Sequence, residues 1–155
     1  MDDFDRFVER LQEEIFEEAR QAYGQKGFER WRNPRFQGRM ASADTYARVT
    51  GDCGDTMEIY LKIENNRIKE ASYFTDGCAS SNICGSFAAE LALGKDPDDL
   101  ADINGDSLLS AVGLLPEEDH HCAHLAAATL QEALHRYMTD SRQSRHSERP
   151  VSKKG

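Results

Sequence analysis

The spacing of apolar residues changes twice along this chain, and that change limits the possible folds more than any other feature. Apolar residues recur every three or four positions near the start and again after about residue 80, as in amphipathic helices. Between about residues 43 and 75 they alternate with polar residues instead, as at Met57, Ile59 and Leu61. A run of strands with helices before and after it predicts an α+β fold.

The alternating segment predicts three strands. Two cover residues 46–49 and 57–63, and Asn65-Asn66, which tolerate positive φ angles, can turn the chain into a third strand over residues 68–75. Consecutive strands joined by short turns pair in antiparallel fashion. We therefore predict a three-stranded antiparallel sheet with the helices packed on one face.

The apolar stripe between Phe4 and Ala22 predicts a helix from Asp2 to about Tyr23. Asp2 or Asp3 can cap its start, and Gly24 can end it. Such a stripe packs against the core of its own domain or, alternatively, docks a partner. Residues 28–38 have no clean period and contain Pro and Gly, so we expect a structured loop there.

Helical spacing returns after the predicted strands. We expect one helix from Ser80 to near Gly94, two short helices at 97–103 and 107–112 capped by Asp96 and Asp106, and a last helix that starts at 116–121 and runs to Met138. The polar remainder has almost nothing to bury. The chain thus divides into an N-terminal amphipathic helix (1–27), one folded domain (28–138) and a disordered polar tail (139–155).

Size and charge exclude several classes of function. The 155 residues suffice for one ordinary domain, and a net charge of -9 at pH 7 repels phosphate backbones, so we expect no nucleic-acid partner. No apolar run approaches the roughly 18 residues of a membrane span. The first residues lack the basic region of a secretory signal, so we expect a cytoplasmic protein that does not bind membranes.

The four cysteines, Cys53, Cys78, Cys84 and Cys122, form no CxxC pair, and a reducing compartment argues against disulfides. All but Cys84 lie at ends of predicted elements, where converging loops build sites. Cys78 and Cys122 fall near helix starts, which predicts partly deprotonated thiols. Thiolates bind soft or borderline metals such as iron and zinc.

Three sulfur ligands leave one position to fill at a zinc ion or a [2Fe-2S] cluster. Asp55, two residues after Cys53, and His121, next to Cys122, are the local candidates, although Asp55 can instead cap a turn and His121 can instead orient a neighbour. Cys84 lies among apolar helix positions, so it belongs to the core or serves as a spare ligand. We expect His120 and His124 at the surface.

Several short motifs together resemble one known family. They are Asn33-Pro34-Arg35 with Gly38, Cys53-Gly54-Asp55-Thr56-Met57, Gly77-Cys78-Ala79-Ser80 and His121-Cys122-Ala123, and the three cysteines are spaced 25 and 44 residues apart. This order and spacing, over about residues 28–138, resembles the NifU/IscU-like scaffold proteins of iron-sulfur cluster assembly.

The resemblance implies a fold of the SufE/NifU type and a scaffold rather than an enzyme. Such a scaffold receives sulfur from a cysteine desulfurase, gathers iron, builds a transient [2Fe-2S] cluster and passes it to apo iron-sulfur proteins. By this similarity Cys53, Cys78 and Cys122 are cluster ligands, and Asp55 keeps the cluster releasable. Zinc can occupy the same residues in the isolated protein, and a homo-oligomer is compatible with the family.

The sequence departs from the family in one partner motif. Members served by a DnaK-type chaperone carry Leu-Pro-Pro-Val-Lys before the His-Cys pair, whereas this chain has Leu115-Pro116-Glu117-Glu118-Asp119. Such chaperones favour apolar peptides with basic flanks, so this partnership is in doubt. Two other functions stay open, namely a zinc-binding acceptor that relays persulfide sulfur without building a cluster, and a thiol enzyme with Cys122 as nucleophile and His121 or His124 as base.

Overall fold

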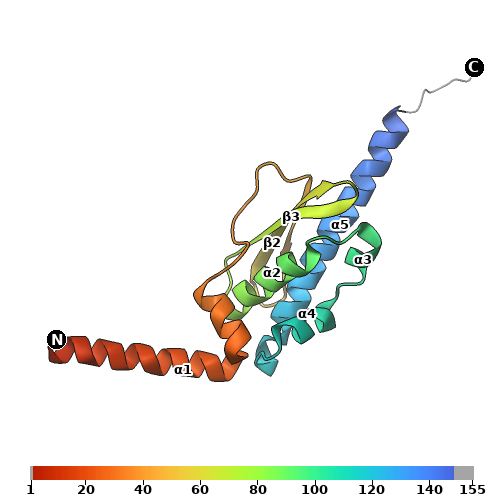
Figure 1. The fold of residues 1–155 in the computed structure, drawn as a ribbon. Coiled ribbons are helices and arrows are strands. Elements are labelled where there is room, and N and C mark those ends of the chain that lie inside the picture. Colours follow the sequence, from red (N-terminus) through yellow and green to blue (C-terminus); the bar gives the residue numbers. More distant parts are fainter. Residues whose placement is uncertain (1, 149–155) are drawn as a thin grey trace, which may run out of the picture.

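A computed structural model describes residues 2–148 of the chain (Figure 1). Helices flank a single run of strands, as the change in apolar spacing predicts. The elements, in chain order, are α1 (Asp3–Arg32), β1 (Thr45–Thr50), β2 (Thr56–Glu64), β3 (Arg67–Thr75), α2 (Ala79–Ala92), α3 (Pro97–Ala101), α4 (Gly105–Val112), the 3-10 helix η1 (Glu117–Asp119) and α5 (His120–Glu148).

The three strands form one antiparallel sheet in the order β1-β2-β3, which confirms the predicted fold class. Asn65 and Asn66 turn the chain between β2 and β3 with φ angles of 55° and 61°. Asparagine adopts this left-handed region more readily than most residues, because its short polar side chain hydrogen-bonds locally. The predicted turn is therefore also confirmed.

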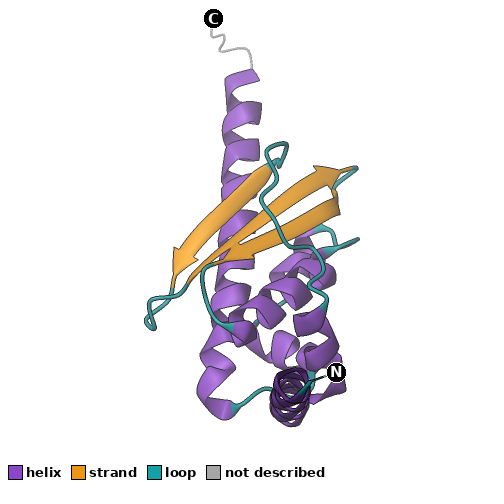
Figure 2. Ribbon diagram, turned by 90° about the vertical axis from the view of Figure 1, so that its left-hand side faces the viewer, coloured by secondary structure: helices purple, strands orange, loops and turns teal. Residues whose placement is uncertain are grey.

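The helices cover one face of the sheet (Figure 2). On β2 the side chains of Met57, Ile59 and Leu61 point to that face and are fully buried, and α2 and α5 pack against it. Helix α2 approaches the sheet closely at Gly85, where an added Cβ would lie only 2.6 Å from the ring of Tyr73. Small residues on the helices thus let their backbones come close to the sheet.

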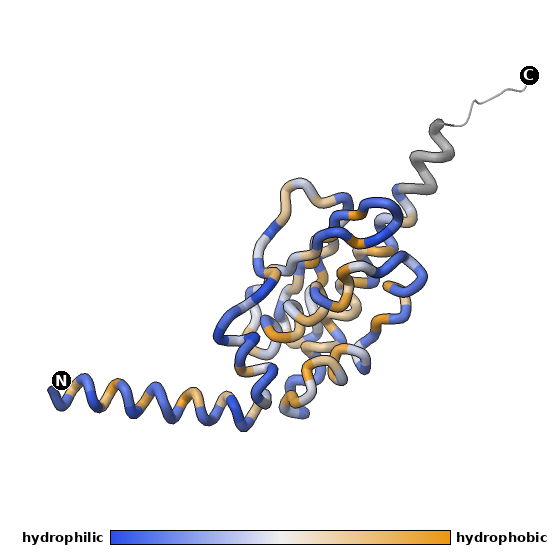
Figure 3. The backbone as a smooth tube through the Cα atoms, in the orientation of Figure 1, coloured by the Kyte–Doolittle hydropathy of each residue, from blue (hydrophilic) through white to orange (hydrophobic). Residues whose placement is uncertain are grey.

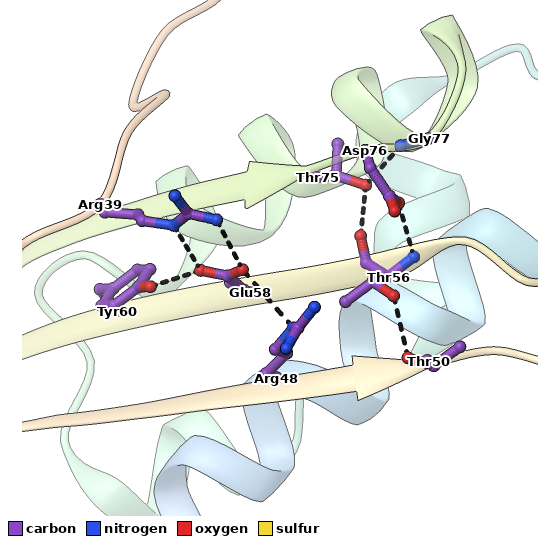
Figure 4. A network of polar contacts seen from close by, with 9 residues as sticks. All are labelled: Arg39, Arg48, Thr50, Thr56, Glu58, Tyr60, Thr75, Asp76 and Gly77. Atoms are coloured by element: carbon purple, nitrogen blue, oxygen red, sulfur yellow. Dashed lines mark hydrogen bonds and ion pairs between the residues drawn. The ribbon is translucent and has the colours of Figure 1, made fainter.

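The opposite face of the sheet carries a polar network (Figure 4). Glu58 is only 6% exposed, and it accepts two hydrogen bonds from Arg39, at 2.9 and 3.1 Å, and one from the hydroxyl of Tyr60. Arg48 adds an ion pair at 3.7 Å. The hydrogen bonds from Arg39 are the main reason why the pKa of Glu58 is lowered, whereas burial is the main reason why the pKa of Tyr60 is raised to about 12.

The first helix differs from the prediction. Asp2 caps α1 as expected, and Gly24 interrupts it with a φ of 72°, but the chain then resumes a helix up to Arg32. The start of the segment predicted as a loop is therefore helical. The rings of Phe28 and Trp31 pack edge-on against that of Phe16, with ring centroids 5.8 and 6.4 Å apart, so contacts across the kink stabilise this second part of α1.

The part of α1 before the kink projects away from the domain (Figures 1 and 3). Every residue from Asp2 to Ile15 is exposed, and Phe4 is 71% exposed. The apolar stripe of this arm, residues 2–15, does not pack against the core of its own chain. Of the two interpretations of the stripe, the core-packing one is wrong for this part of the helix.

Two later helix boundaries also differ. Asn104, not Asp106, caps α4: its side chain accepts from the Ser107 backbone, and the Ser107 hydroxyl accepts from the Asn104 backbone. Helix α5 continues to Glu148, so the start of the predicted disordered tail is helical. Residues 149–155 of that tail lie outside the described residues. Within residues 2–148 no helix is long and apolar enough to cross a membrane.

Candidate metal centre

The turn between β1 and β2 presents Cys53 and Asp55. The turn is closed by hydrogen bonds from Gly51 N to Asp55 O (2.9 Å) and from Gly54 N to Gly51 O (3.0 Å). Gly54 has a φ of 94°, a conformation that side chains with a Cβ rarely adopt. This turn leaves the thiol of Cys53 exposed and Asp55 half-buried at the end of the sheet.

Cys78 lies in the short loop between β3 and α2 and occupies the N-cap position of α2, where its thiol is exposed. The backbone before it is fastened to β2 (Figure 4). Asp76 Oδ1 accepts from Thr56 N at 2.8 Å, and the Thr75 hydroxyl donates to Thr56 O at 2.6 Å while accepting from Gly77 N at 3.1 Å. These bonds fix the position of the Cys78 loop relative to the Asp55 turn.

The start of α5 brings in Cys122 and His121. Cys122 is fully buried, whereas the imidazole of His121 is exposed. Nδ1 of His121 lies 2.9 Å from the carbonyl oxygen of Glu118. A carbonyl only accepts, so Nδ1 carries the proton, and Nε2, 3.6 Å from Cys122 Sγ, has a lone pair that accepts from the thiol or can instead bind a metal.

These segments converge on one place. Cys53, Asp55 and His121 each offer a ligand atom within 4.8 Å of the others, and so do Asp55, Cys78 and Cys122. Asp55 belongs to both groups, so it lies at the centre of the five side chains. Three thiols, a carboxylate and an imidazole suit borderline metals such as iron and zinc. The structure thus brings together every predicted site residue except Cys84.

Cys84 lies elsewhere. It is fully buried among the core residues of α2 and belongs to neither group of potential ligands in the described part of the chain. Burial raises the pKa of its thiol far above the ordinary value. This environment fits the core-packing alternative rather than a spare ligand.

The expected partial deprotonation of Cys122 is wrong for the metal-free protein. Burial raises the pKa of its thiol to about 11, with Cys78, Asp119 and Asp55 adding unfavourable negative charge. A hydrogen bond from Ser81 opposes this shift only in part. The position near a helix start is visible in the sequence, but burial, which dominates here, is not.

A pocket of about 550 Å³ opens beside the site. Its wall combines the Cys53 turn with the first two turns of α5 and contains both ligand candidates and apolar side chains: Val49, Gly51, Asp52, Cys53, His121, His124, Leu125 and Ala128. His124 is exposed, as expected, and its ring lies directly against Gly105 of α4, where no Cβ would fit, whereas His120 is half-buried with Nε2 3.1 Å from the carbonyl oxygen of Leu115. An incoming group can therefore reach Cys53 and His121 from this pocket.

Sequence reasoning missed the residues that support the ligands. Thr75 and Asp76 hold the two loops together, and Ser81 hydrogen-bonds to both Asp55 and Cys122. Ser81 comes three residues after Cys78 at the start of a helix, so helical spacing could have placed it on the same side as Cys78. For Thr75 and Asp76 no comparable pattern exists, because their partner is the backbone of another strand.

The chain is similar to known proteins in sequence. Residues 22–144 match the family described as NifU-like N terminal domain. The chain is 38% identical over 113 residues to the iron-sulfur cluster assembly scaffold protein IscU 1 of Archaeoglobus fulgidus, an alignment that covers 72% of this chain and 74% of that protein.

Solved structures show the same fold. A nitrogen-fixing NifU-like protein (N-terminal) from Brucella abortus superposes with a TM-score of 0.60 at 20% identity, over 78% of this chain and 97% of that one. A putative iron-sulfur cluster assembly scaffold protein for the SUF system from Fervidobacterium islandicum gives 0.60 at 17% identity, over 74% and 98%. Family match, identity and fold agree, and the chain belongs to the family of NifU-like N-terminal domains, in which IscU-type proteins are its relatives.

Proposed function

We propose that this protein is a scaffold on which a transient [2Fe-2S] cluster is assembled and from which it is passed to apo-proteins. Relatives that bear the name of cluster assembly scaffold support the role, and the convergence of Cys53, Asp55, Cys78, His121 and Cys122 carries it. Two irons of such a cluster need four protein ligands. Cys53, Cys78 and Cys122 supply three, and Asp55, which lies within reach of all of them, supplies the fourth in this proposal, with His121 as the alternative.

A carboxylate ligand explains why the cluster would be transient. Asp55 offers harder oxygen atoms than the sulfur of a thiolate, so iron exchanges it more readily. Asp55 is also only half-buried. Water or an acceptor thiol can therefore reach the iron at this ligand first, and release of the cluster would begin there.

The thiols of Cys53 and Cys78 are exposed and can therefore accept sulfur from a donor protein. A cysteine desulfurase would present a persulfide, and a scaffold thiolate would attack its outer sulfur, so that the new S–S bond forms on the scaffold while the donor leaves as a thiolate. Cys122 is fully buried in the metal-free protein, which disfavours it as the first acceptor. The same burial disfavours a thiol enzyme with Cys122 as nucleophile.

The surroundings favour some partners over others. The segment ahead of α5 places Glu117, Glu118 and Asp119 in η1, next to the site, and because of this acidic stretch a DnaK-type chaperone stays a doubtful partner in this proposal. All four cysteines are free, which suits a reducing cytoplasm. The oligomeric state stays a prediction.

A second function has its own observation. Cys53, Asp55 and His121 lie close enough to hold a single zinc ion together with one more thiol. A zinc-binding acceptor that relays persulfide sulfur, without making a cluster, would use the same residues.

Anaerobic reconstitution with ferrous iron and sulfide separates the two functions. The scaffold should retain iron and acid-labile sulfide in about equal amounts after desalting and should absorb visible light. A protein that excludes iron and sulfide but keeps one zinc per chain would overturn the scaffold proposal in favour of the sulfur relay.

A further inference from the structure

Ser81 touches two of the proposed ligands at once. It lies in the first turn of α2, and its side chain is fully buried. Its hydroxyl oxygen is 3.0 Å from Oδ2 of Asp55 and 3.4 Å from Sγ of Cys122. No other described side chain makes hydrogen bonds to both of these groups.

The surroundings of this hydroxyl leave it little freedom. A Cβ added to Gly77 would lie 2.6 Å from Ser81 Oγ and 2.7 Å from Asp55 Oδ2. Only glycine therefore allows the hydroxyl and the carboxylate to meet there. Because Ser81 is one helical turn from Cys78, the same helix start fixes a proposed ligand and the group that contacts two others.

One proton limits what the hydroxyl can do. The ionised carboxylate of Asp55 only accepts, so it is held when Ser81 donates to it. The hydroxyl can also donate to Cys122 Sγ, 3.4 Å away, but its single proton serves one acceptor at a time, and the contact with the carboxylate is the shorter one, at 3.0 Å. The carboxylate held in this way points one oxygen at Ser81 and has a restricted orientation.

We propose that Ser81 is a positioning residue that holds the carboxylate of Asp55 in the orientation from which it binds metal. The inference rests on the proposed function, since it requires Asp55 to be a ligand. Removing a group that hydrogen-bonds to a metal ligand, and so orients it, usually weakens metal binding by about 10- to 100-fold. Ser81 would thus control how firmly the exchangeable ligand is held.

Cobalt(II) titration tests this without any cluster chemistry. The absorption of Co²⁺ reports thiolate and oxygen ligands directly. Ser81→Ala should weaken Co²⁺ binding about 10-fold and change its spectrum. The matched control is Ser80→Ala, because Ser80 is equally buried in the same turn but donates to Asp119 Oδ2 at 2.7 Å instead of to a proposed ligand. The control should bind Co²⁺ within about twofold of the wild type.

A double-mutant cycle identifies the route of the effect. If Ser81 acts through Asp55, adding Ser81→Ala to Asp55→Ala should change Co²⁺ affinity by less than about twofold. An equally large effect in both backgrounds, or a Ser81→Ala protein indistinguishable from Ser80→Ala, would overturn the positioning role. Should Ser81→Ala lower the melting temperature strongly, Ser81→Thr decides instead: the retained hydroxyl should restore the wild-type spectrum, and failure to do so counts against the proposal.

The outcomes separate this inference from the proposed function. A wild-type protein that takes up neither Co²⁺ nor a reconstituted cluster contradicts the scaffold itself. A wild-type protein that takes up both, with no difference between Ser81→Ala and Ser80→Ala, leaves the scaffold intact and removes only the role of Ser81.

Discussion

The five side chains of the metal site come from separate segments and are tied to one another, whereas the arm of α1 is one continuous segment that contacts little else. Thr75, Asp76 and Ser81 make hydrogen bonds that link the site loops, and Cys122 is fully buried beside them. In the arm every residue is exposed. Both regions show regular patterns in the sequence, yet only the first is integrated into the domain.

The difference shows that an amphipathic pattern predicts a helix but does not predict whether the apolar face of that helix is buried. Apolar side chains of α5 such as Leu130 repeat at the same spacing as Phe4 and Leu11 of the arm. Leu130 is fully buried against the sheet, whereas Leu11 is 46% exposed. Substitutions should therefore have large effects at the site and small effects in the arm, and the following experiments test that ranking.

The largest effect should follow loss of a thiol. Changing Cys53, Cys78 or Cys122 to Ala should abolish stable cluster assembly in each case, because one of three sulfur ligands is lost. Cys84→Ala is the control, since Cys84 is buried in the core outside both ligand groups. Iron and sulfide retained after anaerobic desalting measure the effect. A Cys84→Ala protein as defective as Cys78→Ala would show that the three-cysteine assignment is wrong.

Asp55→Ala should act in the opposite direction. Without an exchangeable carboxylate the cluster should persist several-fold longer in air and transfer more slowly to an apo-ferredoxin. The decay of visible absorbance under equal oxygen exposure gives the lifetime. If Asp55 only supports its turn, its removal should instead loosen the site and shorten the lifetime, so the sign of the change decides between the two roles.

A smaller effect, on the stability of the fold, is expected from the polar network on the sheet face opposite the helices. Glu58→Gln removes a buried carboxylate that receives bonds from Arg39 and Tyr60, which should lower the free energy of unfolding by about 1–3 kcal/mol near pH 7. Urea unfolding measures it. Glu64→Gln, in the same strand but exposed, is the control and should change the free energy by less than about 0.5 kcal/mol.

The contribution of Glu58 to the free energy of unfolding should decrease as the pH falls. The pKa of Glu58 is lowered in the folded protein, chiefly by the hydrogen bonds from Arg39, so its contribution is complete above the ordinary value of 4.5 and is lost as the pH falls through the lowered value. The stability difference between wild type and Glu58→Gln should shrink in that acidic range. A difference that grows as the pH falls would mean that folding raises the pKa of Glu58 instead of lowering it.

The sequence predicted those features that depend on local patterns. Alternation gave the strands, Asn65-Asn66 gave their turn, and the motif spacing gave the residues that meet at the site. It did not predict the second part of α1, because that helix depends on the contacts of Phe16 with Phe28 and Trp31. It also misjudged Cys122, whose pKa depends on burial by chain segments distant in sequence.

The smallest effect should follow removal of the arm. Deleting residues 1–12 removes Phe4, Phe7, Val8 and Leu11, all of which are at least 40% exposed. The deletion therefore newly exposes little apolar surface on the rest of the protein. Phe16, which packs on Phe28 across the kink, is retained. Glu13 and Glu14 then stand in the first turn of the shortened helix, where negative charge is favourable.

We therefore expect the melting temperature of the shortened protein to stay within about 2 °C of the wild type, and cluster retention to be unchanged. Phe28→Ala is the contrasting variant, because Phe28 lies after the kink and is only 5% exposed. Its removal should cost about 3 kcal/mol or more, which lowers the melting temperature by several degrees. If the deletion destabilises the protein as much as Phe28→Ala does, the arm contributes to the fold after all, and the contrast between the two halves of α1 fails.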